Sequence, residues 1–132
     1  MNSYKLLFRV FVILFFVITI GRACYDDFTI DNKPVNYSIG LIIDFKRGAK
    51  VAPRFEYEFY VNEKRYTGRY SIVQSEVRNM ENNLIKEHYL NKKFFVKFNE
   101  DSPSINRLML DFPVPENVEP QPLGGWDELP KN

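Results

Sequence analysis

The first apolar feature of the chain is an unbroken run from Val10 to Ile20, and a long stretch of alternating apolar and polar positions follows it. The run is apolar on every face of a helix, so it has no amphipathic stripe with which to pack in a soluble core. Its 11 residues, preceded by Lys5 and Arg9, fit the apolar region of a secretory signal. The pattern predicts an N-terminal apolar helix that directs the chain out of the cytoplasm.

Residues 1–23 are therefore interpreted as a signal peptide or membrane anchor, and three fates remain open for them. Cleavage after Ala23 would release the chain. Retention would leave Leu6–Ala23 as a membrane anchor with its N-terminus inside and an arginine near each headgroup layer. Lipidation of Cys24, as in bacterial lipoproteins, would tether the mature chain. Cys24 is the only cysteine, so no intrachain disulfide supports the fold.

A polar lead-in at 24–36 is followed by strand-like alternation over 37–112. The apolar positions that alternate in the first strand are Ile39, Leu41, Ile43 and Phe45. They are expected to share one face, with Ile42 as an apolar exception on the other face. Lys46–Lys50 is expected to form the turn to the second strand.

The second strand, Phe55–Val61, is expected to form a tight hairpin with the third through Asn62-Glu63. Asn tolerates the positive φ of a type I′ turn, although Gly would be easier than Glu63 at the second position. The two-residue loop fixes the register, which pairs Phe59 with Tyr66, Phe55 with Tyr70, Glu56 with Arg69 and Tyr57 with Gly68. Gly68 leaves room for the ring of Tyr57.

Helical spacing replaces the alternation at Gln74–Asn91, where Val73, Val77, Met80 and Leu84 would form the apolar stripe of one short helix. Two further strands are expected at Lys93–Phe98 and Arg107–Phe112, joined by a polar loop. Five of the eight prolines then fall in 113–132, which predicts an extended tail. Aromatic residues make up 16% of the chain, which suits strands. The expected fold is mainly β: a small antiparallel β-barrel or curled sheet of about five strands with one short helix, preceded by the apolar helix.

The net charge of +1 is distributed unevenly. Between Lys46 and Lys97 there are 12 basic and 6 acidic residues, whereas 98–132 holds 2 basic and 7 acidic residues. The basic residues proposed to contact an anionic surface are Lys46, Arg47, Lys50, Arg54, Arg65 and Arg69. In the tail, Trp126 and Leu129 are candidates for docking, either on a partner or on the domain itself.

No catalytic, metal or cofactor site is expected. His88 is the only histidine, which argues against a histidine metal cluster or a Ser-His-Asp arrangement. Glu56 and Glu58 are two residues apart on one strand, a spacing typical of a solvated face, and Arg65 and Arg69 would neutralise them. No cofactor is called for, and nucleic acid is not an expected partner of an exported chain.

Two stretches resemble small exported or membrane-anchored Bacteroidetes proteins of unknown function. One is 55–68, which is similar to a hairpin pattern Tyr-x-Phe/Tyr-x-Val-Asn-Gly-Lys-x-Tyr-x-Gly, with Glu63 in place of the Gly. The other comprises Lys93–Phe98, Ser102-Pro103 and Arg107–Asp111, similar to the closing pair of strands. The resemblance implies a small barrel or curled sheet in a bacterial envelope, and no activity.

The sequence thus predicts a cell-envelope protein, in the periplasm or anchored facing out of the cytoplasm. We expect a non-enzymatic binding module whose partner is an unknown protein or a membrane surface. The alternative is a carrier of small apolar ligands with an aromatic interior built from Phe55, Tyr57, Phe59, Phe94 and Phe98.

Overall fold

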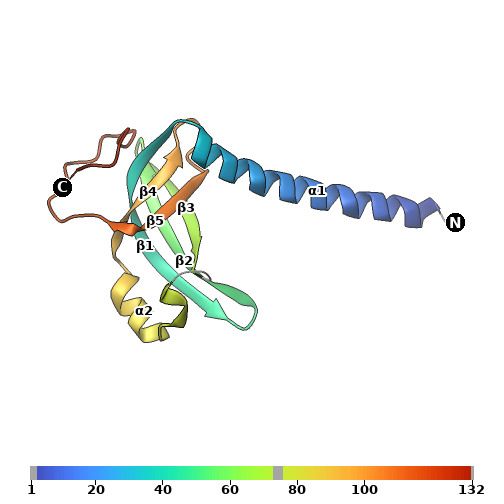
Figure 1. Cartoon of the computed structure of the whole chain (residues 1–132), viewed down its shortest axis with the longest axis horizontal. Coiled ribbons are helices and arrows are strands. Elements are labelled where there is room, and N and C mark those ends of the chain that lie inside the picture. Colours follow the sequence, from blue (N-terminus) through green and yellow to red (C-terminus); the bar gives the residue numbers. More distant parts are fainter. Residues whose placement is uncertain (1–2, 73–75, 132) are drawn as a thin grey trace.

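The computed structural model describes residues 3–72 and 76–131. A long N-terminal helix projects from a small domain of strands, and a short helix and the tail lie on the domain's other side (Figure 1). The helices are α1 (Ser3–Asn32), a 3₁₀ turn at Glu76–Asn79 and α2 (Asn82–Tyr89). The strands are β1 (Val35–Gly48), β2 (Val51–Val61), β3 (Lys64–Ser71), β4 (Lys93–Asn99) and β5 (Asn106–Pro113).

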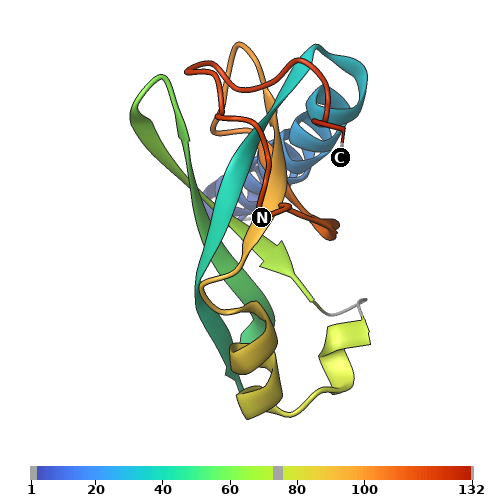
Figure 2. The ribbon, with the colours of Figure 1, turned by 90° about the vertical axis from the view of Figure 1, so that its left-hand side faces the viewer.

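The five strands form one antiparallel sheet in the order β3-β2-β1-β4-β5. The long β1 lies at its centre and pairs with β4 through its first half and with β2 through its second half. The sheet twists strongly, as Figure 2 shows, but the described residues of β3 and β5 do not pair with each other. The prediction of five antiparallel strands with one short helix is confirmed, and the sheet is not closed into a barrel.

The predicted faces of β1 hold for Ile39, Leu41 and Ile43, which lie on one side with Ile42 on the other, and are wrong for Phe45. Ser38, Gly40 and Ile42 are buried, whereas the alternate positions from Ile39 to Ile43 are only half-buried. A register shift between Ile42 and Asp44 marks a β-bulge, after which Phe45 is buried. The bulge adds one residue to the strand, so every side chain after it points to the opposite face. In the sequence, the segments before and after the bulge look like one continuous alternation.

The β2–β3 hairpin is confirmed in every predicted pair. Phe59 lies opposite Tyr66 and Tyr57 opposite Gly68, with no register shift along the ladder. Asn62 and Glu63 both have positive φ, 50° and 65°, as a type I′ turn requires. The turn therefore decides which side chains of β2 enter the core.

The core lies on one face of the sheet and is dominated by aromatic rings from β2 and β4. Phe59 packs against Phe98 with ring centroids 5.7 Å apart, and Val77 and Ile85 extend the core from the helical segment. The predicted single helix is instead a 3₁₀ turn followed by α2, in which Ile85 is buried and Leu84 is 42% exposed. The predicted helix positions at 73–75 lie outside the described residues.

The tail returns to the first strand instead of extending away from the domain. Trp126 and Tyr37 exchange two backbone hydrogen bonds of 2.8 and 2.9 Å, an antiparallel bridge beside β1. The amide of Asn62 donates to the carbonyl of Leu123 at 2.6 Å, so the tail also contacts the β2–β3 turn. The tail thus fills the space where β2 separates from the beginning of β1.

Helix α1 is exposed along its apolar part and docks on the sheet through its last turns. Thr29 and Ile30 are buried, and α1 contacts β4. Arg107 on β5 donates to Asp31 at 3.2 Å and to Asp27 at 3.3 Å. By length and composition this helix near the N-terminus is able to cross a membrane, although a signal sequence would pass the same test. The helix runs past Ala23 to Asn32, so part of the predicted lead-in is helical.

Candidate binding site

The outer face of β2 and β3 carries a ladder of paired charges. Glu56 lies 3.4 Å from Lys46, 3.5 Å from Arg54 and 3.8 Å from Arg69. Glu58 accepts a 2.5 Å hydrogen bond from the guanidinium of Arg65. The predicted neutralisation of Glu56 and Glu58 by the arginines of β3 is confirmed. Both carboxylates are half-buried, with 22% of Glu56 and 20% of Glu58 exposed, and each has a basic partner within 4 Å.

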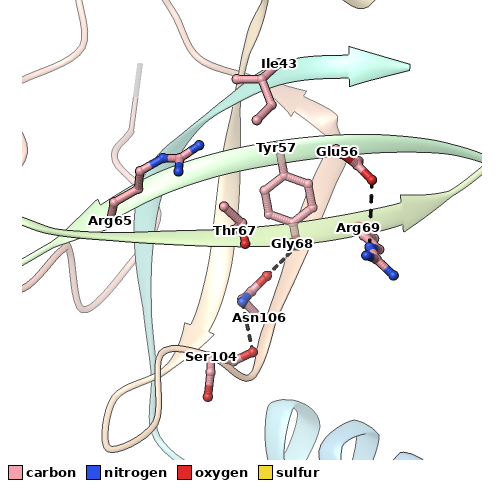
Figure 3. Close-up of a pocket in the computed structure, with 9 residues that line it drawn as sticks. All are labelled: Ile43, Glu56, Tyr57, Arg65, Thr67, Gly68, Arg69, Ser104 and Asn106. Atoms are coloured by element: carbon pink, nitrogen blue, oxygen red, sulfur yellow. Dashed lines mark hydrogen bonds and ion pairs between the residues drawn. The ribbon is translucent and has the colours of Figure 1, made fainter. Parts of the chain in front are cut away.

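An open hollow of about 580 Å³ lies beside this ladder, where β3 approaches the loop between β4 and β5 (Figure 3). Its lining residues are Ile43, Glu56, Tyr57, Arg65, Thr67, Gly68, Arg69, Ser104 and Asn106. Most of these side chains are polar, and both hydrogen-bond donors and acceptors reach the hollow. The hollow is therefore suited to a polar ligand or an exposed polar segment of a partner.

Tyr57 and Asn106 form the innermost wall of the hollow. The Tyr57 hydroxyl donates to Asn106 Oδ1 at 2.6 Å, and the Asn106 amide donates to the carbonyls of Pro103 and Ser104 at 3.1 and 3.0 Å. Gly68 makes this contact possible, because a Cβ there would lie 2.3 Å from the Tyr57 ring and 2.4 Å from Asn106 Oδ1. The three residues bring the adjacent strands β2 and β3 together with β5, which lies at the other end of the sheet order.

Burial raises the pKa of Tyr57 well above its usual value of 10.0, although a hydrogen bond involving the Leu108 backbone and the charge of Arg107 act in the opposite direction. The phenol therefore keeps its proton at neutral pH. Because its hydrogen bond is directed to Asn106, Tyr57 acts as a structural donor in the wall of the hollow.

The six predicted basic residues have different partners in the structure. Lys46, Arg54, Arg65 and Arg69 belong to the charge ladder, each within 4 Å of a carboxylate. Arg47 turns toward the helical segment and donates to the carbonyl of Met80 at 3.2 Å and to the Asn82 side chain at 3.0 Å. Lys50 stands exposed at the β1–β2 turn. Lys46 and Arg54 therefore belong to the ladder and also flank the β1–β2 turn.

The two tail candidates both lie against the domain's own sheet. The Trp126 ring packs edge-to-face on Phe95 with centroids 6.0 Å apart. Leu129 lines a second hollow with Phe95 and Phe112. Of the two docking alternatives, the structure places these residues on the domain itself.

A glutamine that the sequence did not single out holds the tail in position. Gln121 Oε1 accepts hydrogen bonds from the Ile39 amide at 2.9 Å and the Ser38 hydroxyl at 3.1 Å. Its amide donates to the carbonyl of Tyr60 at 3.0 Å. Nothing in a Pro-rich tail distinguishes this Gln from a solvated one, because its partners on β1 and β2 are more than 60 residues away.

The five aromatic residues proposed to line a carrier's interior are all buried, with at most 7% exposure. Their rings contact one another, as in the pairs Tyr57 with Phe59 and Phe59 with Phe98. This packing gives the carrier alternative no support.

Other candidate residues lie apart from the hollow. Cys24 is an exposed free thiol on α1. His88 is exposed on α2, with its Nδ1 3.0 Å from the carbonyl of Leu84. Within residues 3–72 and 76–131 no group of three or more His, Cys, Asp or Glu side chains is placed to hold a metal ion.

Comparison of the chain with protein-family models, curated proteins and solved structures found no match.

Proposed function

We propose that this chain is a cell-envelope protein in which helix α1 tethers a small β-domain outside the cytoplasm, where the domain acts by binding rather than by catalysis. One observation carries the proposal. The apolar segment of α1 is entirely outside the domain, with Leu7 72%, Phe11 68% and Phe15 61% exposed. Exposed apolar surface costs about 25 cal/mol per Å², so a segment of this size requires lipid around it or removal by processing.

The charges that flank the segment support an outward-facing domain. Lys5 and Arg9 precede the apolar run, and basic residues next to a membrane-spanning helix favour the cytoplasmic side. The sheet domain follows the helix and would then lie on the opposite side. The resemblance to exported Bacteroidetes proteins supports the same location.

The junction between helix and domain supports tethering in a defined orientation. Asp27 and Asp31 pair with Arg107, and Asp31 also lies 3.8 Å from Lys97. Thr29 and Ile30 are buried at the same junction. If residues 1–23 are removed, these contacts remain with the domain, so a chain lipidated at Cys24 would keep the same junction.

The outer face of β2 and β3 is the proposed binding surface. The hollow there combines Arg65 and Arg69 with the polar groups of Thr67 and Asn106. We further infer that the domain belongs to the partly open type of five-stranded barrel, because the Tyr57–Asn106 hydrogen bond joins β2 to β5 across the unpaired edges. Barrels of the OB type bind ligands on the face of strands two and three, an analogy of fold that favours the same surface.

The experiment is fractionation and intact mass of the full chain expressed in a bacterial host. We expect the protein in the membrane fraction, digested by protease added to spheroplasts, with either the full-length mass or an added acyl mass. Cys24→Ala separates these two fates, since it abolishes acylation and leaves a retained anchor unchanged. A soluble chain lacking 1–23 would support export without a tether.

A control variant tests the role of the apolar segment itself. Leu14→Arg with Val17→Arg places two charges in the middle of α1, far from the sheet, and should abolish membrane association. If the unmodified full-length chain stays soluble in the cytoplasm, the proposal is contradicted.

A further inference from the structure

We propose that the β1–β2 turn is a second membrane contact, which rests on anionic lipid headgroups of the leaflet from which α1 emerges. This inference depends on the proposed tether. The turn region is defined here as residues 46–54, with Lys46, Arg47, Lys50 and Arg54 as its charged residues. It lies at the end of the sheet remote from the α1 junction, on the side of the domain toward which α1 runs (Figure 1).

The distance between the membrane and the domain is short enough for the turn to reach the lipid headgroups. From Cys24 to Asn32 the helix rises about 13 Å, at 1.5 Å per residue. The headgroup layer of one leaflet takes up roughly 5–8 Å of that distance. A part of the domain that projects along α1 therefore needs to extend only a few ångströms to meet it, and the buried Thr29 and Ile30 keep the helix from swinging freely.

The composition of the turn region matches an anionic surface rather than an apolar one. It contains four basic residues and no acidic residue. Lys46 and Arg54 share Glu56 as a partner, and Lys46 also lies 3.9 Å from Asp44, so the four basic residues still outnumber these two carboxylates. Lys50 is exposed at the tip, and next to it Val51 is 38% exposed. Basic residues close to an anionic leaflet each contribute about a fivefold preference for the bound position.

The observations favour lipid over a protein partner because the turn and the tether face the same way. A protein partner would have to enter the narrow space between domain and membrane. The acidic tail provides an internal contrast, since it lies on the side of the domain away from the direction of α1. The two charged regions of the chain would thus be separated along the membrane normal.

The test places the full chain in lipid nanodiscs and measures how close the turn lies to the headgroups. A fluorophore on Ala49→Cys, in a Cys24→Ser background, is quenched by lipids that carry a nitroxide on the headgroup. We expect stronger quenching in discs containing phosphatidylglycerol than in discs of phosphatidylcholine. The difference should disappear in 1 M salt, where the screening length falls to about 3 Å.

Lys50→Glu should abolish the lipid-dependent difference, whereas Lys131→Glu, an exposed lysine in the tail, should preserve it. Equal quenching in both lipids, or none in either, would overturn the membrane contact and leave the tether intact. Failure of the chain to enter the discs at all would overturn the tether instead, so the two proposals fail in distinguishable ways.

Discussion

The hydroxyl of Tyr57 on β2 donates a 2.6 Å hydrogen bond to the side chain of Asn106 at the start of β5. These strands lie on opposite sides of β1 and β4 in the sheet order, so the bond crosses the open side of the sheet. Tyr57 is 1% exposed, and its partner is half-buried. The pair holds the curled shape in place of a backbone ladder between the two edges.

Tyr57→Phe should therefore lower the free energy of unfolding by about 1–2 kcal/mol, because Asn106 Oδ1 would lose its donor in a partly buried position. Urea unfolding of the full chain in detergent, followed by near-UV circular dichroism, provides the measurement. Tyr66→Phe is the control, since no hydrogen bond of the Tyr66 hydroxyl is found within the described residues. Equal losses from both variants would contradict the role of the Tyr57 bond.

Alkaline pH should destabilise the protein through Tyr57. Burial raises its pKa above the unfolded value of 10.0, so the folded state holds the proton more tightly. The stabilisation is fully present below about pH 10 and is lost as the pH rises toward the folded pKa. Burial, followed by the charge of Asp111 and then Tyr89, also raises the pKa of Tyr70. Tyr57→Phe should reduce, but not abolish, the fall in urea midpoint between pH 8 and pH 11.

Gly68→Ala should disrupt the same contact from the opposite side. The new Cβ would lie 2.3 Å from Cζ of Tyr57, so the ring or β3 must move, at a cost of about 1–3 kcal/mol. Gly48→Ala is the matched control, because a Cβ at that position meets nothing within 4 Å. The midpoint of urea unfolding should fall for the first variant and stay unchanged for the second. If Gly68→Ala is neutral, the close packing described here is wrong.

Glu63→Gly should stabilise the β2–β3 hairpin. Glu63 has a φ of 65°, which is unfavourable for a residue with a Cβ and easily adopted by Gly. Relief of this strain should raise stability by about 0.5–1 kcal/mol after the greater freedom of Gly in the unfolded chain is counted. Glu63→Ala keeps the strain while removing the charge, so it should give no increase in melting temperature. An increase in the melting temperature of Glu63→Ala alone would indicate that the charge of Glu63, and not its backbone conformation, limits the stability of the hairpin.

Gly125→Ala should detach the tail. Gly125 has a φ of +83°, and a Cβ would lie 2.5 Å from the carbonyl oxygen of Tyr37. Trp126 is the only tryptophan, so its fluorescence reports directly on the packing against Phe95. We expect a red shift of its emission and faster proteolysis after residue 113. At Gly124 the nearest atom to a Cβ is 3.8 Å away, and Gly124→Ala should keep the native spectrum.

The parts of this fold that depend on neighbouring residues could be predicted from the chain alone. The β2–β3 pairing follows from a two-residue turn and an alternating pattern, both contained within Phe55–Tyr70. The apolar helix is likewise a local property, since composition over Val10–Ile20 decides its compatibility with lipid. The pair of Glu56 with Arg69 followed from the hairpin register, because directly opposed side chains interact.

Contacts between residues far apart in the sequence decided the other features of the fold. The residues that make these contacts have no neighbouring sequence pattern that would predict them. The bulge between Ile42 and Asp44 interrupts the alternation of β1, so Phe45 lies on the buried face with Ile42 and not with Ile43 as predicted. The tail docks through Gln121 and Trp126, whose partners on β1 are more than 80 residues away. The sequence alone thus determined the hairpin and the apolar helix, each from the conformational preferences of a short segment. Tertiary structure alone decided where the tail lies and which residues line the hollow beside Tyr57. Contacts between strands that are remote in the sequence leave no repeating pattern along the chain from which they could be predicted.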